Sequence, residues 1–355
     1  MSIELTSPAA VLALPLAHPE RVFSGDPAAL QKEWRTLAAQ WHPDRHGGSA
    51  DAQRAFQHLG ALRDEAEARI AAGLLAAPNE IEFTAIDGRQ YRLRDVRVRA
   101  FELGETYIGR STLAYAVSKT GRDLFEAATA RIAALGFAND AMRRQFSAGL
   151  PKIVSTFETA SRLVLVLRRD PDFVALSDLL AHLGGRLEPV HLAWVIGGLE
   201  NLACYLAQQG LVHGAIGPGT VFVAPRTHQV ALLGGWWYAT RAGATLTALP
   251  GHAMRVLPPM ILDGGRSAPA IDLELIRALG REALGDPAGS RILHDGSVPR
   301  PFARWLTHAP AATAYADYAN WETVRDASFG KRRFVELKVS PEHIHTTPQP
   351  LGTGV

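Results

Sequence analysis

The sequence is nearly without cysteine, and Cys204 is the only one among its 355 residues. A single thiol excludes an internal disulfide and a zinc site built from cysteines. It fits a reducing cytoplasm, which we expect as the compartment. The chain also lacks an uncharged apolar run of about 18 residues, so we expect no membrane span. Its first twenty residues contain no Lys or Arg and are interrupted by Pro15, unlike a secretory signal.

An excess of charge of one sign is missing as well. The chain has 37 Lys and Arg residues against 35 Asp and Glu residues, which leaves a net charge of +2. This balance gives no global field that favours nucleic acid, so we expect no nucleic-acid partner. A hydrophobic share of 47% with 20% charged residues indicates globular, core-forming protein. The length suffices for two or three domains of roughly 100–200 residues each.

Two helices are expected near the N-terminus. In residues 27–41 the apolar side chains recur every three or four positions, which places them on one face of a helix. They are Leu30, Trp34, Leu37 and Trp41. Asp26 is a suitable N-cap, and Pro43 ends the helix because a residue before proline is driven out of the α region. A second helix over 49–70 should return antiparallel to the first. The residues buried between them are expected to be Trp34, Leu37, Phe56 and Leu59.

The loop between these helices contains His42-Pro43-Asp44. Together with its flanks, the stretch 32–62 resembles the second helix, His-Pro-Asp loop and third helix of J-domains, and the resemblance extends over about residues 10–72. J-domains stimulate the ATPase of DnaK-type chaperones. The resemblance implies that Asp44 pairs with a chaperone arginine while His42 and Pro43 orient the loop. It also implies that exposed cations bind an acidic chaperone surface, namely Lys32, Arg35 and Arg45.

From residue 80 the pattern changes to strands. Asp87-Gly88 predicts a hairpin turn, and 106–117 and 162–169 read as strands on either side of a helix over 123–135. Beyond residue 173 the periodicity is mainly helical. Helices are predicted over 176–184, 189–209, 271–284, 299–307 and 319–328, with a strand pair at 220–224 and 229–233. The polar, proline-containing tail is expected to be disordered.

The segment 202–237 resembles the catalytic-loop region of protein kinases. The family pattern is H-R-D with an asparagine five positions after the aspartate, followed by a strand and D-F-G. His213 stands at the histidine position. The catalytic aspartate, the metal-binding asparagine and the D-F-G aspartate are replaced by Ala215, Thr220 and Gly234. The double tryptophan that follows, Trp236-Trp237, is expected in a buried loop core.

The upstream region agrees with this resemblance. Ala116 takes the position of the strand lysine, Glu126 that of its helical glutamate partner, and Asp272 that of the structural aspartate on the central helix. Phosphoryl transfer needs a charge clamp on the phosphates and a held magnesium ion. The clamp and metal positions carry no charge, which predicts a pseudokinase with no metal or cofactor. These positions are Ala116, Ala215, Thr220 and Gly234.

As a whole, the chain resembles bacterial and phage proteins that fuse a J-domain to a kinase-like domain. They are labelled serine/threonine kinases because of the fold, and they share a late basic-aromatic segment like 329–334. The expected fold class is α+β, an all-α helical hairpin followed by a bilobal kinase-like fold. The expected parts are a J-domain (1–72), a linker (73–84), an N-lobe (85–170), a C-lobe (171–338) and a disordered tail (339–355).

These resemblances imply a J-domain co-chaperone whose partners are a DnaK-type chaperone and a client or partner protein bound by the body. Two alternatives stay open from the sequence. One is a diverged serine/threonine kinase with non-standard catalytic residues, and the other is a non-catalytic scaffold. Whether ATP binds between the lobes is also left open.

Overall fold

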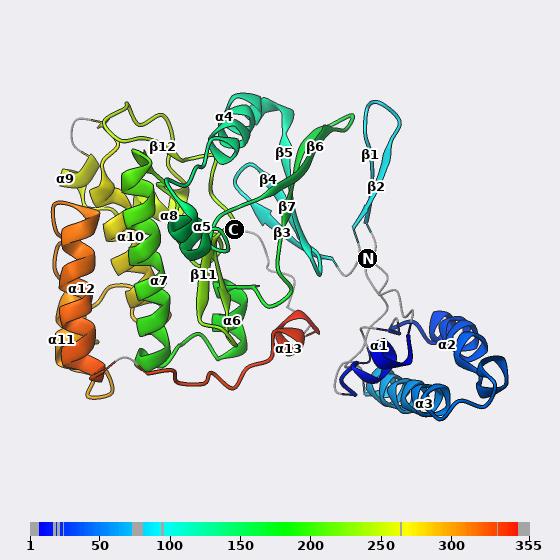
Figure 1. Cartoon of the computed structure of the whole chain (residues 1–355). Helices are drawn as coiled ribbons and strands as arrows, with labels where there is room; N and C mark the ends of the chain where they lie inside the picture. Colours follow the sequence, from blue (N-terminus) through cyan, green and yellow to red (C-terminus); the bar gives the residue numbers. More distant parts are fainter. Residues whose placement is uncertain are drawn as a thin grey trace. The chain divides into compact units, whose positions relative to one another are not determined.

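The computed structural model describes most of the chain. The described residues are 7–16, 19, 22–23, 25–72, 81–93, 96–262, 265–331 and 333–346. The chain divides into two compact units (Figure 1). The first, called the N-terminal unit, comprises Met1–Glu82, Arg92–Val96 and Thr346–Val355. The second, called the body, comprises Phe83–Tyr91 and Arg97–His345.

The N-terminal unit is helical. Its elements are α1 (Pro8–Leu12), α2 (Pro27–Trp41), a short 3-10 helix η2 (Pro43–His46) and α3 (Ala50–Ala71). The Asp26 carboxylate accepts hydrogen bonds from the N–H groups of Ala28 and Ala29 at 3.2 Å, which confirms the predicted N-cap. His42 leaves the helical region with φ −60° and ψ 130°, as its position before proline requires.

The core of the N-terminal unit differs from the predicted one. Leu59 is fully buried as expected, but Trp34, Leu37 and Phe56 are only half-buried. The reason is α1, which packs against α3 and turns a neighbouring face of the hairpin into the interior. The buried cluster consists of Val11, Leu14, Phe23, Leu30, Trp41, Ala55, Leu59, Leu62 and Ala66. Trp34 packs instead between the ring of Phe56, at 5.7 Å, and the guanidinium of Arg63, at 4.7 Å.

A hairpin, whose residues are divided between the two units, precedes the body's five-stranded antiparallel sheet of order β3-β4-β5-β7-β6. The hairpin turns at Gly88, with φ +83°, as Asp87-Gly88 predicted. The strands are β1 (Ile81–Thr84), β2 (Gln90–Leu93), β3 (Arg97–Phe101), β4 (Gly104–Ile108), β5 (Thr112–Ser118), β6 (Ile153–Glu158) and β7 (Arg162–Arg168). The predicted single strand over 106–117 is wrong, because a short turn after Gly109 separates β4 from β5.

The rest of the body is mainly helical, as predicted. Between β5 and β6 in the sequence are η3 (Lys119–Gly121), α4 (Arg122–Ala133) and α5 (Asp140–Phe146). Helix α4 packs against the sheet, whereas Phe146 of α5 meets Tyr205 of α7. The helical lobe contains α6 (Leu176–His182), α7 (Pro189–Gln208), α8 (Gly251–Val256), α9 (Pro259–Leu262), α10 (Pro269–Ala283), α11 (Arg300–Thr307) and α12 (Ala314–Phe329). Its short strands are β8 (Val174–Ala175), β9 (Leu211–Val212), β10 (Val221–Ala224), β11 (Gln229–Leu232) and β12 (Thr240–Arg241).

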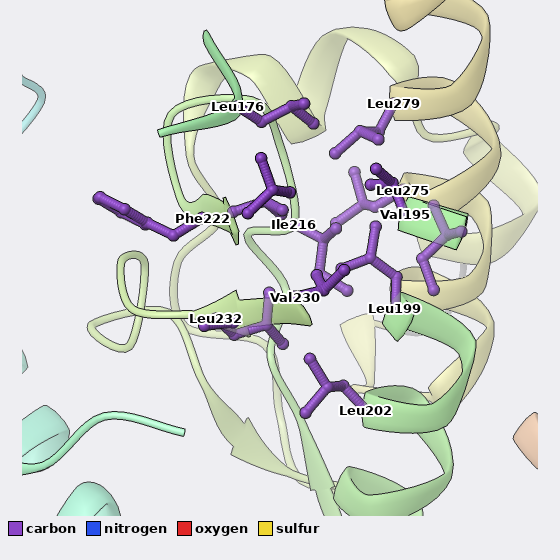
Figure 2. Packing of buried hydrophobic residues seen from close by; sticks show 14 of the residues in the cluster. Leu176, Val195, Leu199, Leu202, Ile216, Phe222, Val230, Leu232, Leu275 and Leu279 are labelled. Atoms are coloured by element: carbon purple, nitrogen blue, oxygen red, sulfur yellow. The ribbon is translucent and has the colours of Figure 1, made fainter. Parts of the chain in front are cut away.

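Helix α7 lies at the centre of the helical lobe. By length and composition alone it is apolar enough to cross a membrane, since Glu200 is its one charged residue. In the structure it packs against α10, α12 and β11, and more than half of its residues are buried. Figure 2 shows Val195, Leu199 and Leu202 of α7 meeting side chains of α10 and the strand pair. The helix therefore forms the core to which the neighbouring loops are attached.

A buried ion cluster joins α7, α10 and α12. The guanidinium of Arg277 lies 2.7 Å from Asp317 and 3.6 Å from Glu200, and it covers the ring of Trp305 at 3.5 Å. All three charged side chains are almost completely buried. Burial and the nearby Asp317 carboxylate raise the pKa of Glu200 to about 9. Within the cluster, Arg277 therefore balances the charge of Asp317, and the raised pKa of Glu200 favours its protonated, neutral form.

The C-terminal segment differs from the predicted disorder. Residues 341–346 form helix α13 (Pro341–Thr346), and the side chains of Leu337 and Ile344 are buried. Arg226 ties this segment down by pairing with Asp172 at 3.0 Å and with Glu342 at 2.6 Å. The segment is polar in composition, but the burial of Leu337 and Ile344 anchors the short helix. The remainder of the predicted tail, 347–355, and residues 73–80 of the predicted linker lie outside the described residues.

Candidate functional site

The His-Pro-Asp loop lies at the end of the α2–α3 hairpin. The side chain of Asp44 is 89% exposed, and that of His42 is 51% exposed. The imidazole Nδ1 of His42 accepts a hydrogen bond from the backbone N–H of Asp44 at 3.4 Å. Its ring edge meets the face of Phe56 at 5.8 Å. Histidine and proline therefore fix the loop against α3, and the aspartate is presented to solvent.

Cations accompany this acidic tip. Lys32 and Arg35 are exposed and stand three residues apart on α2, so they share one helix face. Arg45 is exposed directly after the loop. The neighbouring His46 stacks on the buried Trp41 at 5.2 Å, and its Nε2 lies 2.9 Å from the carbonyl oxygen of Gln40. The structure thus combines a carboxylate at the tip with a basic face along α2.

The degenerate kinase positions come together only in part. Ala215, Thr220 and Gly234 converge where the segment after β9 meets the end of β11. A Cβ atom on Gly234 would lie 3.0 Å from the Cα of Thr220, and one on Gly235 would lie 2.8 Å from the Cβ of Ala215. The Thr220 hydroxyl donates to the carbonyl oxygen of Ala215 at 2.6 Å and accepts from the Gly217 N–H at 3.0 Å. Both partners are backbone groups of the same loop, so the Thr220 hydroxyl stabilises the loop conformation.

Ala116 and Glu126 do not join this group. Successive side chains of a strand point to opposite faces of the sheet. Tyr115 belongs to the main core cluster and approaches Gly234, whereas Ala116 does not belong to that cluster. Ala116 therefore lies on the opposite face of β5 from Tyr115, and its assignment to the lysine position stays a prediction. Glu126 is 65% exposed and lies 3.8 Å from Arg122 on its own helix.

Asp272 and His213 form the buried support of the loop. The Asp272 carboxylate accepts hydrogen bonds from the backbone N–H groups of His213 and Gly214, each at 2.7 Å. Burial raises its pKa to about 6, against the effect of those two donors. The His213 ring contacts the carbonyl oxygen of Gly234 at 2.9 Å, and burial lowers its pKa to about 4. A neutral, fully buried imidazole positions backbone and has no access to a substrate.

Gly234 has no room for a carboxylate. An added Cβ would lie 2.7 Å from the phenolic oxygen of Tyr115, which itself donates a hydrogen bond to the carbonyl oxygen of Leu233 at 3.3 Å. Contacts under 3.0 Å force something to shift. The aspartate that holds magnesium in a kinase therefore cannot be accommodated here without moving Tyr115.

An aromatic cluster joins the sheet, α4 and the segment after β11. Its members are Phe101 of β3, Tyr115 of β5, Phe125 of α4 and Trp237 after β11. Trp237 stacks with Phe101 at 5.9 Å and with Phe125 at 6.4 Å, and it meets Tyr115 edge-on at 5.2 Å. The sequence pointed to a buried Trp236-Trp237, which is confirmed, but carried no signal for the partner rings. They come from three other elements.

Ion pairs also join the sheet to the helical lobe. Arg97 and Arg99 of β3 both pair with Asp178 of α6, whose side chain is 1% exposed. Arg99 further donates to the Ser177 hydroxyl at 2.8 Å. The buried Arg169, directly after β7, donates to the carbonyl oxygen of Gly109 in the β4–β5 turn at 3.0 Å and to that of Phe173, just before β8. The described residues contain no group of three His, Cys, Asp or Glu side chains that could hold a metal ion.

Comparisons with known proteins bear on the body. No family model matches the chain, and no curated protein matches it. Among solved structures, it is similar to vaccinia related kinase 3, with a TM-score of 0.51 at 17% identity. The match covers 77% of this chain and 97% of that one. At this identity the likeness shows the fold alone. The chain therefore contains a mixed helix-and-sheet domain with a protein-kinase fold.

Proposed function

We propose that this protein is a J-domain co-chaperone that stimulates the ATPase of a DnaK-type chaperone. The observation that carries the proposal is the exposed Asp44 carboxylate at the tip of the α2–α3 hairpin. A carboxylate held on a rigid loop can form a charge-assisted bond with a partner arginine. Stimulation then follows if the hairpin binds one conformation of the chaperone more tightly than another, which shifts the chaperone's population.

The basic face supplies the second part of the proposal. Lys32, Arg35 and Arg45 would attract an acidic chaperone surface and orient the encounter. Few charges take part, and Gln31 and Gln40 stand where related hairpins often carry cations. We therefore expect affinity that is weak and sensitive to salt, because exposed charges are screened within a Debye length.

We propose further that the body is a non-catalytic module that binds a client or partner protein. Phosphoryl transfer depends on positioned cations and anionic magnesium ligands. Ala215, Thr220 and Gly234 supply none of them, and Tyr115, which approaches Gly234, packs against Trp237 at 5.2 Å. The alternative of a diverged kinase predicts radiolabelled phosphate transfer from ATP to the chain or to a generic substrate. Such transfer above background would reject the non-catalytic role.

The deciding experiment is a steady-state ATPase assay of a DnaK-type chaperone from the native host. The full chain should stimulate the chaperone, and Asp44→Asn should return the rate to its basal value. Asp64→Asn is the matched control, since Asp64 is an exposed acid on α3 away from the loop. Absence of stimulation by the wild type, or equal stimulation by Asp44→Asn, would reject the co-chaperone role. In that case a pull-down that keeps its partners with Asp44→Asn would support the scaffold.

A further inference from the structure

We propose that a cavity of the helical lobe binds an acidic peptide segment that also carries an apolar side chain. The cavity has a volume of about 810 Å³ and lies away from the degenerate kinase positions. Its walls come from α5, α7, the β10–β11 turn, α12 and the described residues that follow α12, namely 330, 331 and 333–335. Figure 1 labels α5, α7, β11 and α12. The inference rests on the proposed function only in naming the occupant as part of a client or partner.

The positive charge of the residues that line the cavity favours a negatively charged ligand. Among the described residues that line the cavity there is no Asp or Glu, whereas four are cations: Arg144, Arg325, Lys331 and Arg333. Arg325 is neutralised by Asp326 at 2.8 Å and Glu322 at 3.6 Å. Within the described part of the chain, Arg144, Lys331 and Arg333 have no carboxylate at ion-pair distance. Three unneutralised cations around one cavity create a positive potential that an acidic segment would complement.

A buried donor in the wall also lacks a partner. Trp321 of α12 is 0% exposed, and its indole Nε1 has no hydrogen-bond acceptor among the described residues. It faces Gly197 of α7, where an added Cβ would lie 3.2 Å away. The indole N–H of Trp194, also in the wall, is unsatisfied as well. Buried donors are normally paired, because an unpaired one has lost its bond to water without a replacement. Carbonyl or carboxylate oxygens of a bound segment would pair them.

The apolar requirement comes from a stack of three rings. His228 lies between Trp194 at 4.5 Å and Phe334 at 4.2 Å, with the ring planes nearly parallel. His228 lies in the β10–β11 turn with φ +55°, an uncommon conformation for a residue other than glycine, and its N–H donates to the carbonyl oxygen of Ala224 at 2.8 Å. Phe334 is 61% exposed although it is a large aromatic side chain. An apolar side chain of the bound segment would cover that ring.

The dimensions favour a peptide over nucleic acid. A volume of this size is typical of sites for small molecules and short segments, which span about 300–1,000 Å³. Nucleic acid is bound by extended basic surfaces. The charged residues of this chain nearly balance, with 37 cations against 35 anions. A short acidic segment therefore matches both the charge and the size of the cavity.

The test uses the full chain and a fluorescein-labelled peptide of alternating Glu and Phe residues, followed by fluorescence anisotropy. The double variant Lys331→Glu/Arg333→Glu should weaken binding at least about tenfold. Lys152→Glu, an exposed cation outside the cavity, is the control and should bind like the wild type. A matched peptide with Lys in place of every Glu should not bind. Equal binding of the double variant and the wild type would overturn the proposal.

Two further arms separate the cavity from unspecific charge attraction. Asn201→Trp narrows the cavity without changing its charge and should also abolish binding, whereas unchanged binding would place the peptide elsewhere. An equally labelled single-stranded oligonucleotide that binds more tightly than the acidic peptide would likewise overturn the proposal. Asp44→Asn should retain peptide binding while losing ATPase stimulation, and Lys331→Glu/Arg333→Glu should do the reverse. The two proposals can therefore fail separately.

Discussion

The two units each contain a motif that begins with a histidine, and they use it in opposite ways. His42 is half exposed and its neighbour Asp44 is almost fully exposed, so the loop is open to a partner. His213 is 0% exposed, and Ala215 beside it is equally buried. The comparison teaches that packing decides whether the side chains of such a motif are open to a partner or belong to the core. In the body the same kind of loop has become part of the core.

The largest expected effect is a loss of stability of the body that does not affect the N-terminal unit. Arg277→Ala removes the one cation between Glu200 and Asp317, and an uncompensated buried carboxylate costs about 3–5 kcal/mol. Urea unfolding followed by tryptophan fluorescence should show this loss, while hydrogen exchange of the α2 amides stays unchanged. Arg304→Ala, on the exposed side of α11, is the control. A midpoint equal to that of the wild type would mean that the cluster does not stabilise the body.

The next largest effect concerns the packing of Gly234 against Tyr115 in the buried loop of the body. Gly234→Ala places a methyl group against the phenolic oxygen of Tyr115 and should destabilise the body by about 1–3 kcal/mol, the usual cost of overpacking. Tyr115→Phe removes that oxygen. Gly234→Ala should therefore destabilise the Tyr115→Phe variant less than it destabilises the wild type. A double-mutant cycle on thermal melts measures the difference. Additive effects would show that the two side chains do not collide.

A smaller effect concerns pH. Burial raises the folded-state pKa of Glu200 to about 9, well above the usual range of a glutamate in an unfolded chain. The folded body therefore holds this proton more tightly than the unfolded chain does. That stabilisation is complete below the unfolded pKa and is lost as the pH rises towards the folded one, by at most about 1.4 kcal/mol per pH unit. Glu200→Gln keeps the neutral shape and should flatten this dependence.

Thermal melts of the wild type and Glu200→Gln check this effect. The variant should be the more stable of the two at about pH 8, with little difference at about pH 5. Parallel pH curves for the two proteins would contradict a protonated Glu200 in the folded body.

The smallest effect lies in the N-terminal unit. Asp26→Ala removes the N-cap of α2 and should cost about 1 kcal/mol. Hydrogen exchange should accelerate over α2, while the body melts as before. Asp64→Ala on the exposed face of α3 serves as control. Equal protection of α2 in both variants would show that its start is fixed by packing alone.

Sequence reasoning succeeded where the signal is local. The bounds of α2 follow from Asp26, Pro27 and Pro43, and the strand pair β10–β11 follows from its apolar runs. It did not identify Tyr115 as the neighbour of Gly234, because a shift of one position along a strand moves a side chain to the other face of the sheet. The cavity was beyond reach because Arg144 and Arg333 are remote in sequence. Only the packing of α5, α7 and α12 brings them together.

The contact between Gly234 and Tyr115 couples these two positions. A side chain added at 234 would collide with the phenolic oxygen of Tyr115, whereas a smaller side chain at 115 would remove the ring that meets Trp237 at 5.2 Å. A larger residue at 234 therefore fits only together with a change at 115, and we expect tolerated substitutions at these two positions to come as a pair.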